Sequence, residues 1–376
     1  MANSGQDFTG LQIPCAPGEF TPECLTAILR RSGVIQQSKV ESVQVQEQSI
    51  GFVGQAAHLK LTYDREEPGA PSEIFAKLSS ASAELRAKLN SMGVYETEAG
   101  FYREFSSEMQ VRVPKAYCSH YDAETGECLL LLENIKDLRF GDNVAGSTLG
   151  EARVVVTNLA RMQARHWNDG RLNQCPWLRG DNTDCATVIG MYRGLLPEWE
   201  RKWQGELSPE LVRAARVFGA CMESWFKNLG ASPFTLTHGD FRPDNFAFDE
   251  KGEVVLFDWQ TARRGTNSRD LSYFISFALP TALRRACESE LLALYHGTLR
   301  DNGVRDYTMD QLQKDFRRSI GSALIVGVIA GTLLDFSSER AVQLQRVLCE
   351  RLSAVVSDHE FSEWLPTYLG IAVGQG

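Results

Sequence analysis

Three side chains in the second half of the chain have the types and spacing needed to handle a metal ion and a proton. Asp240 and Asn245 lie in the segment His238-Gly-Asp-Phe-Arg-Pro-Asp-Asn245, and Asp258 follows a short apolar run. In phosphoryl transfer an aspartate accepts the proton of the attacking hydroxyl, while asparagine and aspartate oxygens hold metal against the phosphates. The order and spacing of the three residues therefore favour this chemistry.

Two simpler explanations of these residues have to be weighed. Asp, Asn, Gly and Pro are common turn residues, so a single dipeptide of this kind would mean little. Here the loop follows the strand-like Thr235–His238 and precedes the apolar Val254–Phe257, which ends on Asp258. His238 and Asp240 could instead bind the metal of a hydrolase, but the other histidines are isolated along the chain. We therefore interpret the segment as a phosphoryl-transfer loop.

Three neighbouring residues are candidates for supporting roles in this loop. Arg242 could point positive charge at the transferring phosphoryl group, whose equatorial oxygens carry charge in the transition state. The alternative for Arg242 is a surface arginine paired with Asp244 or with solvent. His238 is expected to hold the loop by packing and hydrogen bonding. Asp270 is expected to cap the next helix or brace the loop rather than to bind metal.

A lysine interrupts an apolar strand in the first half of the chain, where Lys77 lies within Ile74-Phe-Ala-Lys-Leu78. It could occupy an exposed position on an edge strand. It could also hold nucleotide phosphates, provided that a helix supplies a carboxylate partner. Glu98 is the candidate because it shares a helical stripe with apolar residues, where a carboxylate is costly unless it is paired. Glu96 and Glu104 are the alternatives.

Two weaker signals concern the nucleotide. Gly51 and Gly54 lie in a turn between strands, and the backbone of Gly51–Gln55 is expected to cover the phosphates. The pattern is neither Gly-x-Gly-x-x-Gly nor a Walker loop, so the signal is limited. Backbone groups near Glu133 to Ile135, after the run of leucines, are expected to pair with the adenine edge. Such a backbone contact leaves no side-chain signature in the sequence.

Hydrophobic periodicity predicts an α+β chain of two lobes. Residues 1–40 form an arm and a helix, 41–135 a small lobe, and 136–376 a larger, mostly helical lobe. The small lobe is expected to hold five antiparallel strands and one main helix. The boundary near residue 135 should leave a cleft that holds the chemistry. Strands are expected at 43–46, 58–63, 73–78, 114–118 and 127–132, and helices at 149–168, 186–204, 208–229, 269–278, 281–301, 309–334 and 338–356. In the larger lobe strands are expected only beside the Asp240–Asn245 loop.

Composition narrows the class of protein. The chain has 376 residues, of which 43% are hydrophobic, so it can bury a large core. Its net charge of -9 and the absence of a basic stripe argue against a nucleic-acid partner. The nine cysteines are odd in number and never form a Cys-x-x-Cys pair, which predicts reduced thiols and a cytoplasmic location.

Neither a signal peptide nor a membrane span is expected. The first residues are polar and lack a basic segment followed by an apolar run. The one suspicious stretch, Ser319–Phe336, has an uninterrupted apolar part shorter than the roughly 20 residues needed to cross a bilayer. A buried core helix is the preferred interpretation of this stretch.

The chain resembles the aminoglycoside phosphotransferase-like superfamily of small-molecule kinases, and within it the choline-kinase-like and ecdysteroid-kinase-like proteins. The resemblance covers residues 40–330, most of the chain. The matching segments are the loop His238–Asn245 and Val254–Gln260, supported by Glu98–Tyr102, Leu130–Glu133, Leu159–Trp167 and Asp270-Leu-Ser. Two departures are Met162-Gln163-Ala164, where the family usually has Leu-His-Ala, and Asp258-Trp-Gln260 in place of Asp-Phe-Gly, as is usual in this branch. The first departure could alter local packing, and neither changes the predicted metal ligands.

The resemblance implies a protein-kinase-like fold and transfer of the γ-phosphate of ATP, with Mg2+, to a hydroxyl of a small molecule. It makes Asp240 the catalytic base and Asn245 and Asp258 the magnesium ligands. It makes Lys77 and Glu98 the pair that holds the phosphates.

Two other functions remain open at this point. A protein kinase is disfavoured because His-Arg-Asp, Asp-Phe-Gly and Ala-Pro-Glu are absent and 259–270 is too short for a regulated activation segment. A non-catalytic nucleotide-binding or interaction module is disfavoured because every key side chain is present. The sequence does not identify the acceptor, the oligomeric state or the preference between ATP and GTP.

Overall fold

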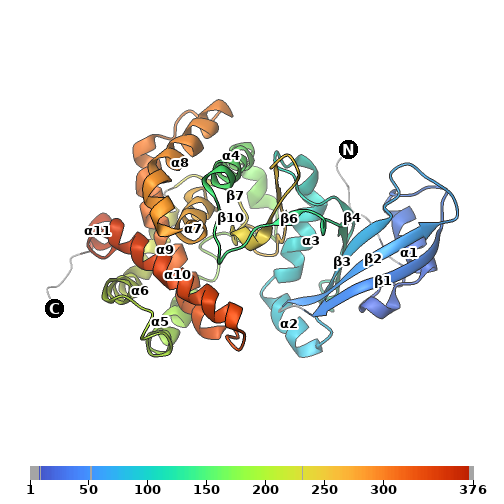
Figure 1. Cartoon of the computed structure of the whole chain (residues 1–376), viewed down its shortest axis with the longest axis horizontal. Helices are drawn as coiled ribbons and strands as arrows, with labels where there is room; N and C mark the ends of the chain where they lie inside the picture. The colour runs from blue at the N-terminus through green and yellow to red at the C-terminus, as the bar shows by residue number, and fades with distance from the viewer. Residues whose placement is uncertain (1–7, 9, 51–52, 231, 372–376) are drawn as a thin grey trace. The chain divides into compact units, whose positions relative to one another are not determined.

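A computed structural model describes residues 8, 10–50, 53–230 and 232–371, and it divides the chain into two compact units (Figure 1). Unit 1 comprises Met1–Arg139 together with Val255–Ala262, and unit 2 comprises Phe140–Val254 together with Arg263–Gly376. The first division lies between Arg139 and Phe140, whereas the sequence predicted a boundary near residue 135. The segment Val255–Ala262 differs from expectation, because the sequence placed it in the helical lobe.

Unit 1 is built on a five-stranded antiparallel sheet with the order β1-β2-β3-β5-β4. The five strands expected from alternating hydrophobicity are confirmed. Their bounds are β1 (Val40–Ile50), β2 (Gly54–Tyr63), β3 (Glu73–Ser79), β4 (Ala116–Tyr121) and β5 (Cys128–Glu133). The helical elements are η1 (Pro17–Glu19), α1 (Pro22–Arg31), α2 (Ala83–Ser91), α3 (Val94–Glu104) and η2 (Ser106–Glu108).

One helix of unit 1 was not expected. Ser82 caps α2 by accepting a hydrogen bond from the Leu85 N–H, and only Leu89 of this helix is buried. With so short an apolar stripe, the helix gives little periodic signal. Met92 ends α2 and is 55% exposed.

The two faces of the sheet are covered by different helices, and Figure 1 shows the sheet between α1 and α3. On β3, Ile74 and Ala76 join the apolar core shared with α1. Side chains alternate along a strand, so Lys77 projects from the opposite face. There α3 contacts β4 and β5. Strand alternation therefore directs the lysine toward the helix that carries Glu98.

Two long-range contacts explain why Val255–Ala262 belongs to unit 1. The indole of Trp259 is fully buried and stacks on the ring of Phe101 in α3, with 3.8 Å between ring centroids. The Leu256 N–H donates to the Arg112 carbonyl at 3.0 Å. Phe101 and Arg112 lie far from this segment in the sequence. The local hydrophobic periodicity therefore does not indicate that the segment packs in unit 1.

Unit 2 is mostly helical, and each helix predicted there is present to within a few residues. The helices are α4 (Leu149–Arg165), η3 (Gly170–Gln174), α5 (Cys185–Lys202), α6 (Pro209–Leu229), η4 (Pro243–Asn245), α7 (Ser268–Ala278), α8 (Thr281–Asp301), α9 (Met309–Leu333), α10 (Glu339–Asp358) and α11 (Phe361–Tyr368). The strands are β7 (Phe234–Thr237), β8 (Phe246–Phe248) and β10 (Arg263–Thr266), while β6 (Arg139–Phe140) and β9 (Val254–Leu256) contain unit boundaries.

Two elements of unit 2 correct the sequence prediction. β10 pairs antiparallel with β7, although no strand was expected after Asp258. This strand has only four residues, two of them arginines, so it has no apolar alternation to detect. The final helix α11 was also missed, because it has eight residues and contains Pro366.

Helix α9 includes most of the apolar stretch that raised the question of a membrane span. By length and composition it could cross a membrane, with a mean hydropathy of 1.3 over its most apolar window. In the structure 67% of that window is buried, and residues such as Ile320 and Leu324 join the core formed with α5, α6, α7 and α10. A core helix of a folded domain passes the same test of length and composition.

Candidate active site

The loop that follows β7 is held in place by the side chain of Asp270 in α7. The Asp270 carboxylate accepts hydrogen bonds from the backbone N–H groups of His238 at 2.7 Å and Gly239 at 3.0 Å. Burial raises the pKa of Asp270, and its contacts with His238 and Gly239 partly oppose this shift. Gly239 has a φ of +86°, a conformation that glycine adopts without strain. The loop is thus braced by Asp270, one of the two structural roles that the sequence offered for it.

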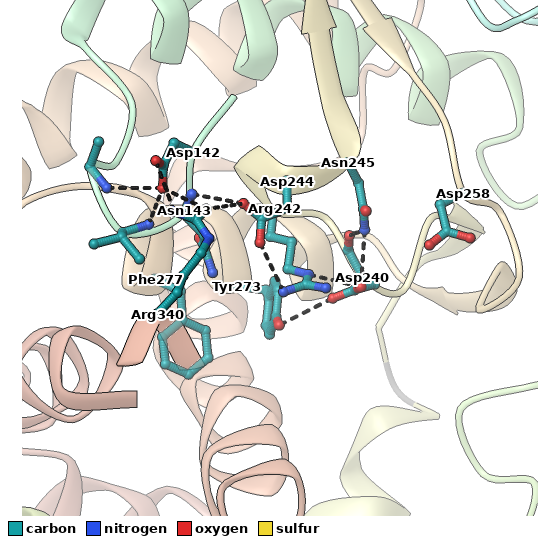
Figure 2. Close-up of polar contacts among 12 residues, drawn as sticks. Asp142, Asn143, Asp240, Arg242, Asp244, Asn245, Asp258, Tyr273, Phe277 and Arg340 are labelled. Carbon is teal, nitrogen blue, oxygen red and sulfur yellow. Dashed lines mark hydrogen bonds and ion pairs between the residues drawn. The ribbon is translucent and has the colours of Figure 1, made fainter. Parts of the chain in front are cut away.

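The Asp240 carboxylate is fixed by three donors, as Figure 2 shows. Its Oδ2 accepts from Arg242 Nε and from Asn245 Nδ2, each at 3.0 Å, and its Oδ1 accepts from the Tyr273 hydroxyl at 3.2 Å. Asn245 Nδ2 also donates to the Asp240 carbonyl at 2.8 Å. The Asp240 side chain remains 25% exposed, so an oriented carboxylate is still accessible from outside.

Arg242 lies between two carboxylates. Besides Asp240, its guanidinium contacts Asp244 Oδ2 at 3.3 Å, and Asp244 Oδ1 in turn accepts from the Asn143 N–H at 2.9 Å. Burial lowers the pKa of Arg242, but the carboxylates of Asp240 and Asp244 outweigh it and raise the pKa. The pairing with Asp244, offered by the sequence as the alternative for Arg242, is present. A role of Arg242 toward a phosphoryl group stays a prediction.

The sequence did not identify Tyr273, which lies one helical turn after Asp270 on α7. Its ring is 7% exposed and packs edge-on against Phe277 at 5.0 Å between centroids. Burial raises the pKa of Tyr273 above its usual range, and the neighbouring Asp240 raises it further. The phenol therefore keeps its proton and acts as a donor. The only sequence signal for it was its spacing of three residues from Asp270.

In unit 1, Lys77 is held between two carboxylates. Its Nζ lies 2.7 Å from Glu98 Oε2 and 2.7 Å from Asp258 Oδ1. Burial lowers the pKa of Lys77, but the two carboxylates outweigh it and raise the pKa, so the ammonium stays charged. Burial raises the pKa of Glu98, against the lowering effect of Lys77. The sequence predicted the pairing with Glu98 but not the direct contact with Asp258.

Asp258 has a backbone conformation that few residues adopt. Its φ of +65° lies in the left-handed region, where aspartate and asparagine are tolerated better than other non-glycine residues. Such strain persists only where the surroundings impose it, and it is frequent at functional sites. Here the stacking of the adjacent Trp259 on Phe101 and the ion pair with Lys77 hold Asp258 in place.

The remaining predicted residues have structural explanations of their own. A Cβ at Gly54 would lie 2.1 Å from the Leu78 carbonyl oxygen, so the close approach of β2 and β3 requires glycine there. The Glu133 N–H already donates to the Lys115 carbonyl at 2.8 Å, and the Ile135 carbonyl accepts from the Leu138 N–H at 3.0 Å. Gly51 lies outside the described residues. Nucleotide contacts of Gly51, Gly54, Glu133 and Ile135 stay predictions.

The side chains available for a divalent cation are hard oxygen donors. Asn245 offers a carboxamide oxygen in unit 2, and Asp258 offers a carboxylate in unit 1. Among the described residues no group of three or more His, Cys, Asp and Glu side chains could hold a metal. Each of these two donor types suits magnesium, which is usually bound through one or two carboxylates, substrate phosphates and water rather than by an all-protein cage.

Comparison with known proteins places this fold in a family. The model of the phosphotransferase enzyme family matches residues 72–307, more than half of the chain. A choline kinase from Cryptosporidium parvum Iowa II is similar in structure, with a TM-score of 0.56 and 12% identity over 93% of this chain and 100% of that one. No curated protein sequence matches this chain.

Two further structures are similar. An ethanolamine kinase from Plasmodium vivax has a TM-score of 0.51 and 12% identity over 90% of this chain and 92% of that one. A putative aminoglycoside phosphotransferase from Ralstonia eutropha JMP134 has a TM-score of 0.48 and 16% identity over 92% and 98%. At these identities the likeness shows the fold alone. The likeness to the choline kinase and the ethanolamine kinase confirms the protein-kinase-like fold expected from the sequence, and the family match confirms the resemblance. The chain thus belongs to the phosphotransferase enzyme family and is a small-molecule phosphotransferase.

Proposed function

We propose that the protein transfers the γ-phosphate of ATP, in a magnesium-dependent reaction, to a hydroxyl group of a small molecule. The observation that carries this proposal is the Asp240 carboxylate, oriented by Arg242, Asn245 and Tyr273 and still partly exposed. A carboxylate held in one orientation is suited to align an incoming hydroxyl and accept its proton. Positioning of this kind is the main source of rate in phosphoryl transfer.

The other residues take supporting roles in this proposal. Lys77, kept charged by its ion pair with Glu98, would bind nucleotide phosphates. Asn245 and Asp258 would hold magnesium, and the bound ion would supply positive charge against the phosphate oxygens. Arg242 holds Asp240 through its Nε and leaves part of its guanidinium for charge stabilisation. The nine cysteines are all free thiols, which supports a cytoplasmic location as part of the proposal.

The two other functions considered from the sequence fit less well. In a non-catalytic binding module, nothing would require a carboxylate with three separate hydrogen-bond donors. A protein kinase would require the recognition motifs that are missing from the sequence. The acceptor is proposed only at the level of a hydroxyl-bearing small molecule.

The proposal is tested by ADP release from ATP and Mg2+ in the presence of a panel of hydroxylated metabolites. With the acceptor found, Asp240→Asn should lower kcat by about 100-fold or more, because loss of a general base typically costs 10²–10⁴. Asp249→Asn is the matched control. Its carboxylate accepts from Lys251 and Glu253 backbone N–H groups in a turn of the same unit, so turnover should be unchanged.

Two results would contradict the proposal. One is full turnover by Asp240→Asn with the acceptor identified. The other is a wild-type protein that binds no ATP and releases no ADP with any acceptor class in the panel.

A further inference from the structure

Helix α3 carries three side chains, one helical turn apart, that each reach a different segment of unit 1. Glu98 pairs with Lys77 on β3, and Phe101 stacks on Trp259 next to Asp258. The first of the three, Tyr95, donates its hydroxyl hydrogen to the Val53 carbonyl at 2.7 Å. Residues three apart lie on one face of a helix, so a single face of α3 joins these segments.

The Tyr95 hydroxyl makes two hydrogen bonds. Besides donating to Val53, it accepts from the Ser80 N–H at 3.1 Å, directly after β3. The residue is 5% exposed, and burial raises the pKa of its phenol, so the hydroxyl keeps its proton. A phenylalanine would fill nearly the same volume. The hydroxyl is therefore needed for the contacts with Val53 and Ser80 rather than for packing.

The segment Val53–Gln55 is the described part of the turn that the sequence assigned to the nucleotide phosphates. Gly54 packs directly against the Leu78 carbonyl, one residue beyond Lys77. The Gln55 side chain donates to the Ser79 carbonyl at 3.2 Å and to the Cys15 carbonyl at 3.1 Å. Hydrogen bonds thus reach this segment from α3, from β3 and from the N-terminal arm, and Tyr95 provides the link to α3.

We propose that Tyr95 is a positioning residue for the nucleotide phosphates. It holds Val53 and Gly54 in a fixed relation to Lys77, through the same helix that holds Glu98. This inference rests on the proposed function and deepens it, because it names a residue outside the predicted ligand set that sets phosphate affinity. It has a specific consequence. Removing the hydroxyl should weaken the binding of phosphates and leave the binding of the nucleoside unchanged.

The test compares Tyr95→Phe with the wild-type chain and with Tyr63→Phe. The control removes a hydroxyl in the same unit that likewise donates to a backbone carbonyl, that of Pro71, at 2.8 Å. Titration calorimetry measures the affinity for AMP-PNP with Mg2+. The affinity for adenosine is measured by its displacement of bound AMP-PNP. Amide hydrogen exchange of residues 53–56 is measured without nucleotide.

In Tyr95→Phe we expect the dissociation constant of AMP-PNP to rise by about three- to tenfold, because, of the two hydrogen bonds lost, only the one to Val53 holds the segment that is assigned to the phosphates. Adenosine affinity should stay within twofold of wild type, and exchange at 53–56 should accelerate. Tyr63→Phe should match wild type in all three measurements. A merely structural role of Tyr95 would weaken the binding of AMP-PNP and the binding of adenosine equally. That result would overturn the inference.

Failure of this inference can be told apart from failure of the proposed function. If wild type binds AMP-PNP and Tyr95→Phe binds it equally well, only the role of Tyr95 is refuted. If wild type binds neither AMP-PNP nor ATP, the proposed function is refuted and this inference falls with it. Should Tyr95→Phe fold poorly, Gln55→Ala loosens the same segment from the side of β3. Gln55→Ala should then show the same loss of AMP-PNP affinity, with adenosine affinity unchanged.

Discussion

Asp240 shows how a proposed base can be constrained by its neighbours. Its two carboxylate oxygens share three donors, from Arg242, Asn245 and Tyr273. Each donor limits the rotation of the carboxylate, so the lone pair that would receive a proton has a defined direction. For a reaction that depends on alignment more than on base strength, this restriction is useful.

The contribution of Tyr273 can be measured by removing its hydroxyl. In Tyr273→Phe, Asp240 loses the donor to Oδ1 and gains rotational freedom. We expect kcat to fall by about three- to tenfold, as for one hydrogen bond, while KM for ATP stays unchanged. Steady-state kinetics with the identified acceptor check this prediction. Tyr368→Phe, which loses a hydroxyl contact to Asn228 elsewhere in unit 2, should behave as wild type. An equal rise of KM in both variants would speak against a role for Tyr273.

At the scale of elements, two helices organise the predicted functional groups. In unit 1, α3 connects Val53, Lys77 and the segment that contains Asp258. In unit 2, α7 supplies Asp270 to the backbone of the loop and Tyr273 to the Asp240 carboxylate. Both helices use side chains spaced one turn apart on a single face: α3 joins three separate segments, and α7 holds one loop at two places. A rigid helix of this kind can hold a loop with little freedom.

The support from α7 predicts a large effect on stability. In Asp270→Ala, the buried N–H groups of His238 and Gly239 lose their acceptor, and each unsatisfied group costs about 1–3 kcal/mol. We expect the free energy of unfolding to fall by about 2–5 kcal/mol in urea denaturation. Asp270→Asn, which keeps one acceptor oxygen, should lose less stability than Asp270→Ala. Asp249→Ala, in an exposed turn of the same unit, should lose less stability than either variant of Asp270. An equal loss of stability in all three variants would refute the bracing role of Asp270.

At the scale of the whole molecule, the predicted residues are divided between the two units. Lys77, Glu98 and Asp258 belong to unit 1, and Asp240, Arg242 and Asn245 belong to unit 2. The chain passes from unit 1 to unit 2, returns for Val255–Ala262 and leaves again. Within each unit the charged groups of this set are paired with one another, Lys77 with Glu98 and Asp258 in unit 1 and Arg242 with Asp240 in unit 2.

Nucleotide binding should stabilise the folded chain through these groups. At 100 times its dissociation constant, a ligand that binds only the folded state adds about 2.7 kcal/mol. We therefore expect AMP-PNP with Mg2+ to raise Tm, and expect most of this rise to be lost with EDTA or in Asp258→Ala. Asp122→Ala removes a carboxylate from a turn of unit 1, where it accepts from Glu124 and Thr125, and should keep the full rise. A metal-independent rise, equal in Asp258→Ala, would contradict the assignment of Asp258.

Local features of the sequence determined much of this protein. The loop His238–Asn245, the five strands of unit 1 and most helices of unit 2 were predictable, because turn residues, caps and hydrophobic periodicity act over a few neighbouring positions. The pairing of Lys77 with Glu98 was also predictable. A charged residue on each of two apolar faces requires a partner.

The tertiary structure decided the contacts between segments that are distant in sequence. Lys77 meets Asp258 across 181 residues, Tyr273 meets Asp240 across 33, and Tyr95 meets Val53 across 42. The attachment of Trp259 to unit 1 and the pairing of β10 with β7 are of the same kind. These contacts form because the folded core brings the segments together. Since each partner is an ordinary residue in its own local context, its neighbours in the sequence carry no signal of the pairing.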